Sequence, residues 1–187
     1  MEDHKIVALY WQRNPDAIGE TERKYGSYCF RVAKNLLPTS QDAEECVSDT
    51  WLGAWNSIPP QRPGCLRQYL AKLTRNLSFT RYKALTAQKR GGGELPLVLE
   101  ELSECLADET DVEGEAIARE LAQSVQNFLA ALPEREAGIF LRRYFYAEPV
   151  EEIARSRGLT PNHVSVMLSR TRTKLRQHLL MEGYFNE

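Results

Sequence analysis

The residues best suited to chemistry with a partner follow Pro161, where short polar and basic side chains recur along one face of a predicted helix. Amide, hydroxyl and guanidinium groups at this spacing can hydrogen-bond to the base edges and phosphates of duplex DNA. The chemistry that they predict is therefore recognition, without bond breaking. The side chains expected on the outer face are Asn162, His163, Ser165, Val166, Ser169 and Arg170, with Arg172 and Lys174 behind them.

Two short helices joined by a tight turn must position these side chains. Pro149 fits the start of the first helix, because the N–H that it lacks is unpaired there in any helix. Gly158 supplies a left-handed residue to end that helix, and Thr160 caps the second, with Pro161 at its first position. This arrangement is a helix-turn-helix, whose second helix enters the major groove. A helical hairpin with a solvated basic face is the alternative.

A stripe of carboxylates marks another predicted helix, residues 40–56. Acidic residues in a first helical turn are expected there, because they interact favourably with the positive end of the helix dipole. Asp49 lies well inside the helix, however, and stacks over Glu45 as a like-charged pair that costs a few tenths of a kcal/mol. The acidic stripe, Asp42, Glu45 and Asp49, fits either a partner-binding surface or a solvated face, and both interpretations stay open.

A basic helix edged with aromatic residues is predicted over residues 65–87, after a loop, 57–64, that contains three prolines. Arg67, Lys72 and Arg75 lie on its outer side, and Phe79 and Tyr82 add aromatic rings. Positive charge beside aromatic rings is typical of surfaces that bind unstacked nucleic-acid strands. A solvated basic face is again the alternative.

Charge is unevenly distributed along the 187 residues, although the net charge is only −2. Residues 1–90 carry fourteen Lys/Arg against nine Asp/Glu, a net of +5, and residues 119–187 carry ten against eight, a net of +2. The stretch 91–118 has nine Asp/Glu and no Lys or Arg. Two basic segments separated by an acidic one agree better with nucleic-acid binding than the total charge does.

Helical periodicity without strand-like alternation predicts an all-α fold. We expect two small helical domains, residues 1–90 and 116–187, joined by an acidic flexible linker, 91–115, that carries one short ordered or partner-binding turn. The C-terminal domain contains the helix-turn-helix. The predicted helices besides those of this motif are 3–12, 15–36, 40–56, 65–87, 116–132 and 134–146.

Several classes of protein are disfavoured by composition. No apolar run approaches the length of a membrane span, and the N-terminus lacks a signal-peptide pattern, so we expect a cytoplasmic protein without membrane insertion. The four cysteines show no CxxC pair and no histidine at ligand spacing, so we predict reduced, mostly buried thiols and no metal site. With no phosphate-binding glycine loop and no nucleophile–base arrangement, we expect no enzymatic activity, no cofactor and no small-molecule substrate.

The order of these pieces resembles a bacterial RNA polymerase sigma factor of the small, two-domain extracytoplasmic-function type. Asp42–Trp55 is similar to the polymerase-binding helix of that family, and Leu70–Leu77 to the start of its promoter-melting helix, where an Arg-Asn pair is usual. The C-terminal matches are Leu132–Glu136, Val150–Ala154 and Arg170–Arg172. Each motif is weak alone, but their order and spacing make the resemblance specific.

The resemblance implies a promoter-specificity subunit whose partners are core RNA polymerase, promoter DNA and an anti-sigma factor. Core polymerase would bind Asp42, Glu45, Asp49 and Leu52. The −10 element would be opened and read by Gln61, Arg62, Arg67, Lys72, Arg75 and Asn76. The −35 element would be read by Asn162, His163, Ser165, Val166, Ser169, Arg170, Arg172 and Lys174.

The chain also departs from the family pattern. Ser165–Met167 stand where a Lys/Arg-Ser-Arg run is more frequent, Leu77–Thr80 replace the usual Leu-small-Ile-Asp, and Asp49-Thr50 differ mildly from a frequent acidic or amide pair. The alternative function is a helix-turn-helix regulator that binds an operator independently of polymerase. That alternative leaves the acidic stripe and the Arg75-Asn76 helix without a role.

Overall fold

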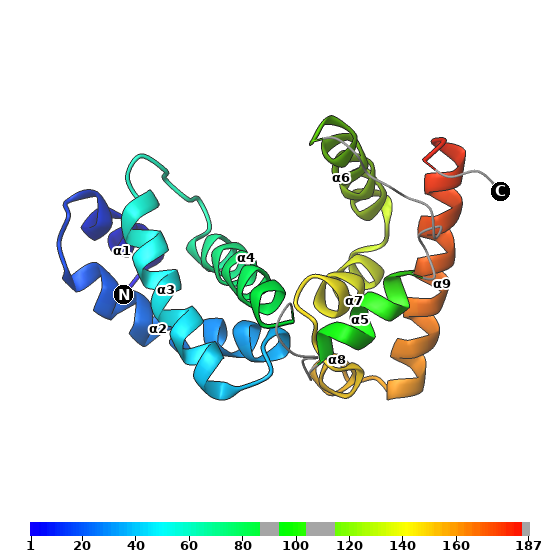
Figure 1. The fold of residues 1–187 in the computed structure, drawn as a ribbon, viewed down its shortest axis with the longest axis horizontal. Helices are drawn as coiled ribbons and strands as arrows, with labels where there is room; N and C mark the ends of the chain where they lie inside the picture. The colour runs from blue at the N-terminus through cyan, green and yellow to red at the C-terminus, as the bar shows by residue number, and fades with distance from the viewer. Residues whose placement is uncertain (87–93, 104–114, 185–187) are drawn as a thin grey trace. The chain divides into compact units, whose positions relative to one another are not determined.

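The computed structural model describes residues 1–86, 94–103 and 115–184, and these form two compact units, Met1–Leu95 and Pro96–Glu187. The described residues form helices and connecting turns, with no strand among them (Figure 1). The expected all-α class with two small helical domains is therefore confirmed. Residues 87–93 and 104–114, which include much of the predicted linker, lie outside the described residues, as do Phe185 and the two residues after it.

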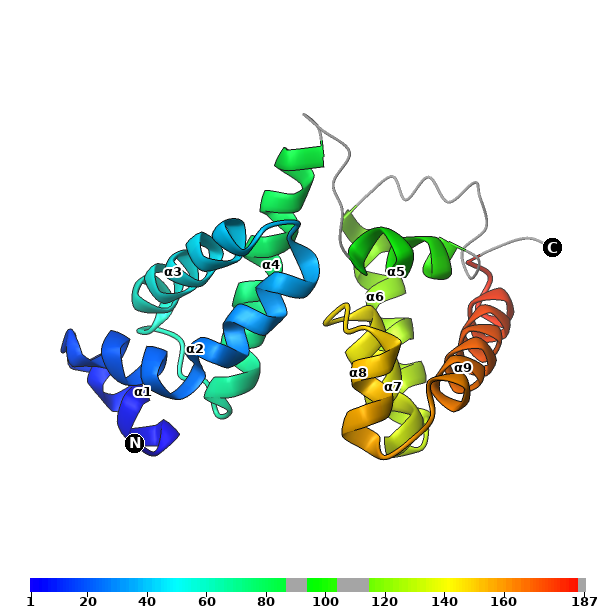
Figure 2. The same ribbon diagram turned by 90° about the horizontal axis from the view of Figure 1, so that it is seen from below.

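The first unit includes, among its described residues, α1 (Asp3–Trp11), α2 (Asp16–Leu36), α3 (Ser40–Ser57) and α4 (Leu66–Thr86). Helices α2, α3 and α4 all pack against one another, and α1 packs on α2 (Figure 2). The core includes Ile6 and Tyr10 of α1, Cys29 of α2 and Leu70 of α4, all fully buried. Helix α1 is thus an integral part of this unit.

A seam of small polar side chains joins α3 to α4. The hydroxyls of Thr50 and Thr74 lie 3.2 Å apart, and the Cys46 thiol lies 3.1 Å from the Ser78 hydroxyl. Thr74 donates to the Leu70 carbonyl, and the single proton of Thr50 can be donated either to Thr74 or to the Cys46 carbonyl, so these buried groups are satisfied without water. Because all four side chains are short, the two helix backbones can approach closely.

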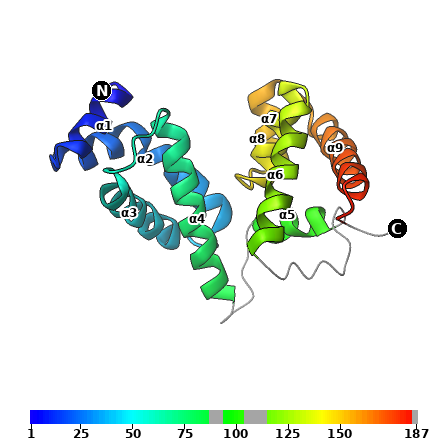
Figure 3. The ribbon, with the colours of Figure 1, turned by 90° about the horizontal axis from the view of Figure 1, so that it is seen from above.

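The second unit contains α5 (Glu94–Ser103), α6 (Glu115–Ala131), α7 (Glu134–Tyr144), α8 (Val150–Arg157) and α9 (Pro161–Met181). Helix α9 packs against α6, α7 and α8, and Figure 3 shows this unit from above. Its buried positions on α9 are Val164, Leu168, Thr171, Leu175 and Leu179, which recur at the spacing of one helical face. This buried stripe leaves the opposite side of α9 accessible to solvent.

The turn between α8 and α9 has the geometry that the sequence predicts. Pro149 precedes α8, and Gly158 ends it in the left-handed region at φ 63°. The Thr160 hydroxyl accepts a hydrogen bond from the backbone N–H of His163 at 3.2 Å, with Pro161 at the start of α9. The helix-turn-helix is therefore fixed by local side-chain chemistry.

Helix boundaries elsewhere agree with the predicted ranges to within two residues, and the main addition is α5. The sequence predicted only one short ordered turn within residues 91–115. The structure has a ten-residue helix there, which belongs almost entirely to the second compact unit. Val98 of α5 is 1% exposed, so this helix is packed against its surroundings.

Candidate nucleic-acid interface and acidic face

The outer face of α9 presents the side chains that the sequence singles out after Pro161. Val166 is 39% exposed, while Val164 and Leu168 on the opposite face are buried. Five further predicted contacts are exposed, and these are Asn162, His163, Ser165, Ser169 and Arg170. The structure therefore brings six of the eight predicted side chains together on one accessible surface, here called the α9 face.

An ion pair holds the element preceding this face. The guanidinium of Arg142 on α7 donates to the Glu148 carboxylate through Nε at 2.8 Å, and also to the Ser156 hydroxyl of α8.

The first turn of α9 has no acidic residue, so no carboxylate there neutralises the positive end of its helix dipole. The beginning of α9 is consequently well suited to approach a phosphate.

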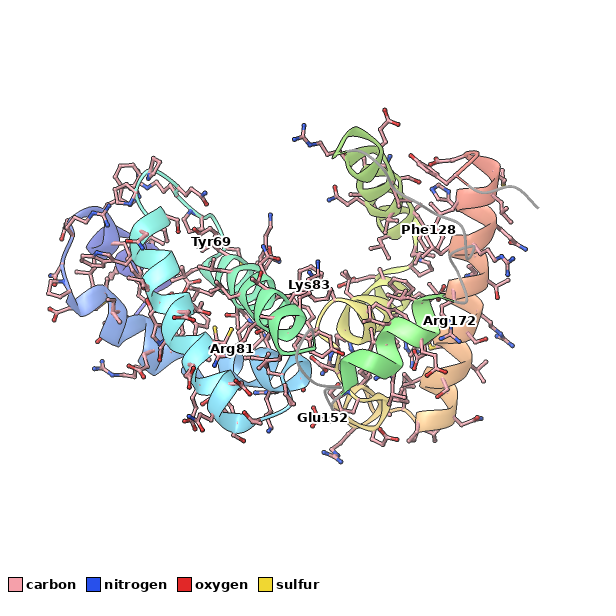
Figure 4. The ribbon with its side chains drawn as sticks, in the orientation of Figure 1. Tyr69, Arg81, Lys83, Phe128, Glu152 and Arg172 are labelled. Atoms are coloured by element: carbon pink, nitrogen blue, oxygen red, sulfur yellow. The ribbon has the colours of Figure 1, made fainter. Side chains whose placement is uncertain are left out.

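The other two predicted contacts on α9 have partners within the second unit. Arg172 donates through Nη1 to the Tyr144 hydroxyl at 2.7 Å and lies 3.6 Å from a carboxylate oxygen of Glu101 on α5 (Figure 4). Lys174 pairs with Glu136 of α7 at 2.8 Å. The structure therefore does not group Arg172 and Lys174 with the α9 face.

On α4, some of the predicted contact residues are exposed to solvent, and others lie over an aromatic ring. Lys72 and Asn76 are exposed. The guanidinium of Arg75 and the ammonium of Lys83 lie 5.8 and 5.0 Å from the centre of the Phe79 ring. A ring with cations at these distances provides both parts of a surface for an unstacked base, an aromatic plane and positive charge.

The loop and the start of α4 contact aromatic rings from α1 and α2. Arg62 lies over the indole of Trp11 at 5.4 Å, and Arg67 lies over the Tyr28 ring at 4.5 Å. Gln61, next to Arg62, is exposed. Sequence reasoning did not single out Trp11 or Tyr28 as partners of these arginines.

The acidic stripe of α3 is connected to α4 by an arginine that sequence reasoning placed only on the basic helix. Arg81 donates through Nε to Asp42 at 3.0 Å and pairs through its Nη2 with Glu45. The pKa of Asp42 lies below its ordinary value, chiefly because the Thr39 hydroxyl donates to it; burial opposes this effect and Arg81 adds to it. Asp42 and Glu45 are thus partly neutralised within the unit.

The remaining predicted residues of this face are fully presented to solvent. Asp49 is exposed, and Leu52, one turn further along α3, is 58% exposed. An exposed leucine beside a carboxylate is the composition of a protein-binding surface with an apolar centre and a charged edge. Asp49 and Leu52 are therefore the parts of the acidic face that a partner can contact without breaking an internal ion pair.

Described residues contain no helix that is long and apolar enough to cross a membrane. Within the same ranges, Cys29 and Cys46 are buried free thiols and Cys65 is an exposed one.

Comparison with known proteins identifies both units. The family model described as Sigma-70 region 2 matches residues 23–88, which cover most of α2 and all of α3 and α4. The model described as Sigma-70, region 4 matches residues 122–175, which run from α6 into α9. Helices α1 and α5 lie outside both matched ranges.

A solved structure entitled "Structure of CnrH in complex with the cytosolic domain of CnrY" is similar along the length of the chain. The two are 21% identical, the match covers 97% of this chain and 98% of that chain, and the TM-score is 0.43. Region 2 is thus followed by region 4 in a chain of two helical units, and each region falls on one unit. The chain belongs to the sigma-70 family, as a two-domain sigma factor that directs RNA polymerase to promoters.

Proposed function

We propose that this sigma factor divides its work among three surfaces: the acidic face of α3 for core polymerase, α4 with the preceding loop for the −10 element, and the α9 face for the −35 element. The observation that carries this proposal is the α9 face itself, where six predicted base or phosphate contacts lie on the accessible side of a correctly capped recognition helix. The chain has no catalytic step in this proposal and acts by binding.

For polymerase binding, the proposed contacts are Asp42, Glu45, Asp49 and Leu52. Asp49 and Leu52 are assigned the direct contact because they are exposed, and Leu52 supplies the apolar area that a stable interface needs at its centre. Asp42 and Glu45 remain paired with Arg81 and contribute negative electrostatic potential to the acidic stripe.

For the −10 element, Lys72 and Asn76 are exposed on α4, and Arg75 lies over the Phe79 ring of the same helix. Extracting a base from the duplex costs a few kcal/mol, which stacking and backbone contacts must offset. We assign Asn76 to hydrogen bonding with an extracted base, and Lys72 and Arg75 to the strand backbone. Gln61, Arg62 and Arg67 are assigned to the loop edge of the same surface.

For the −35 element, the α9 face supplies the base and phosphate contacts, and Arg170 is the one residue there with a guanidinium that can bind a guanine in two places. Arg172 and Lys174 are proposed contacts only if they exchange their partners Glu101 and Glu136 for phosphate oxygens.

The domain division that we propose is region 2 within residues 1–90 and region 4 within 116–187, joined by 91–115. We also propose a cytoplasmic location and an anti-sigma protein as a regulatory partner. Such a protein would compete with core polymerase for Asp49 and Leu52, so its addition should abolish transcription without unfolding the chain.

In-vitro transcription with core polymerase over a promoter library tests the proposed function. We expect transcripts from a subset of templates that share two elements at fixed spacing. Tight operator binding by the protein alone, with no association with core polymerase, would instead support the alternative of an independent helix-turn-helix regulator.

A further inference from the structure

Two arginines and a tyrosine of the second unit converge on a single carboxylate, that of Glu101 on α5. Arg143 of α7 donates through Nη2 at 2.6 Å and through Nε at 3.2 Å. The Tyr144 hydroxyl donates to the same carboxylate at 2.9 Å and itself accepts from Arg172 at 2.7 Å. We call Arg143, Tyr144 and Arg172 the carboxylate site.

The carboxylate site is built for an anionic ligand. The Arg143 side chain is only 3% exposed, and a buried guanidinium requires a charged or well hydrogen-bonded partner. Its Nη1 donates to the backbone carbonyl of Glu148 at 3.0 Å, which leaves the other edge of the guanidinium for Glu101. Burial opposes ionisation of Glu101, but the hydrogen bonds and charges of the site hold its pKa below the ordinary value.

Apolar contacts supplement this ionic anchor. Val98 is almost fully buried, and Leu102 borders a cavity of about 290 Å³. The rest of that cavity is lined by apolar side chains of α6, α7 and α9, including Leu129, Phe140 and Leu179. Helix α5 therefore covers only part of an apolar surface, so its attachment is limited in area and depends strongly on Glu101.

We propose that the carboxylate site holds α5 against region 4 in the free protein and releases it when the sigma factor engages polymerase and both promoter elements. We call this contact between Glu101 and the carboxylate site the clasp, which is closed in the free protein. The opening step rests on the proposed function, whereas the closed clasp does not. In this view the acidic segment is an internal ligand of region 4.

The reason for release is the distance that the chain must span between the −10 and −35 elements. With α5 docked, the connection from Thr86 to Glu94 spans at most about 28 Å. Three helical paths add about 50 Å at most. They are Asn76 to Thr86 on α4, the length of α5, and the part of α9 that leads back to Asn162. Promoter elements named −10 and −35 lie about 25 base pairs, or about 85 Å, apart along straight duplex DNA.

With a closed clasp the fully straightened chain thus reaches about 78 Å, so even complete straightening leaves no length to spare for contact with both elements. Release moves the next fixed point from Glu94 to Glu115 at the start of α6, and the connection then reaches up to about 100 Å. Opening the clasp therefore removes the need to straighten the whole chain, and it ends the contact between Arg172 and Glu101.

Hydrogen–deuterium exchange of the full chain tests the proposal, with α5 amides followed in the free protein and in its complex with core polymerase and a promoter fragment. We expect protection of α5 in the free protein and its loss in the complex. Protection that persists in the complex would overturn the release, because α5 would then be a permanent part of region 4.

Glu101→Gln tests the anchor, because the amide keeps the shape of the carboxylate but turns N–H donors toward the guanidinium groups. We expect α5 protection in the free variant to fall by about tenfold or more. Glu100→Gln, the same charge change at the exposed neighbouring residue, is the matched control and should lower protection less than Glu101→Gln does. Equal protection in both variants would show that Glu101 is not the anchor.

Two readouts separate the possible failures. Circular dichroism shows whether Glu101→Gln keeps region 4 folded, and if it does not, the wild-type comparison of free and bound states still decides the proposal. Failure of the wild-type chain to bind polymerase would refute the proposed function and the release with it. The free-protein comparison of Glu101→Gln with Glu100→Gln would still report on the closed clasp.

Discussion

Arg81 on α4 reaches across to α3 and donates its Nε–H to Oδ1 of Asp42 at 3.0 Å. The same guanidinium pairs with Glu45, so one basic side chain of α4 binds two carboxylates of α3. The acidic stripe is consequently a structural element of region 2 as well as a candidate binding face.

Replacing Arg81 by Gln should lower the free energy of unfolding by about 0.5–1 kcal/mol, because the ion pairs are partly exposed and screened by solvent. The loss should shrink in high salt. Urea unfolding at two salt concentrations measures it, and Lys72→Gln, an exposed charge on the same helix, is the control. Equal midpoints for the two variants would contradict a structural role for Arg81.

The depressed pKa of Asp42 predicts acid-dependent stability. A carboxyl whose pKa is lower in the folded protein than its ordinary 3.8 stabilises the fold fully above that value. The contribution is lost as pH falls through the folded-state pKa. In Thr39→Ala, which removes the main cause of the shift, the deficit relative to wild type should therefore shrink below pH 3.8.

A constant part of that deficit should remain at all pH values, since Thr39 also accepts the N–H of Asp42 as the cap of α3 and such caps contribute about 1 kcal/mol. Urea unfolding across the acid range separates the two parts. A deficit that is independent of pH would show that Thr39 acts only as a cap.

Asp49→Lys and Leu52→Ala should each weaken binding to core polymerase by about 1 kcal/mol or more if they form the direct contact. Both side chains are exposed, so the fold should change in stability by less than about 0.5 kcal/mol. Binding is measured by titration against core polymerase, and Glu44→Lys on the same helix is the charge-matched control. Wild-type affinity in both variants would remove α3 as the polymerase-binding face.

Asn76→Ala should impair promoter opening more than promoter binding, because the side chain is assigned to an extracted base. Permanganate reactivity of unpaired thymines measures opening, and we expect it to fall while duplex binding changes little. Thr80→Ala, another exposed position one turn along α4, is the control. Loss of duplex binding and opening to the same extent would assign Asn76 to the backbone instead.

Arg170→Ala should weaken −35 binding by about 1–3 kcal/mol and relax preference at one base pair if the guanidinium reads a base edge. Binding to a set of single-substitution −35 duplexes measures both effects. An equal loss on every sequence, with a shallower salt dependence, would identify a phosphate contact. Arg176→Ala, exposed further along α9, is the control.

Features set by neighbouring residues could be predicted from sequence. Gly158 and Thr160 determine the turn of the helix-turn-helix through their own backbone and hydroxyl, so the prediction needed no knowledge of packing. Arg172 and Arg62 could not be placed, because the Tyr144 hydroxyl and the Trp11 ring that hold them belong to helices distant in sequence.

The acidic segment, residues 91–115, shows the same limit of prediction from sequence. Its charge predicted a linker, and its apolar patch predicted a short ordered turn. Leu102 nevertheless borders a cavity, and Glu101 binds an arginine pair, that exist only after α7 and α9 have packed. Composition reports how a segment behaves in water, whereas docking depends on a surface that the segment does not encode.

The polar seam between α3 and α4 has a mechanical consequence. Thr50 and Thr74 are fully buried and hydrogen-bonded to each other, so sliding or rotating one helix against the other would leave both hydroxyls with poorer partners. The two helices should therefore move together as one rigid body. A force applied to α3 is then transmitted directly to α4. With the proposed roles of the two helices, binding of polymerase to α3 would act through α4 on the base pairs of the −10 element.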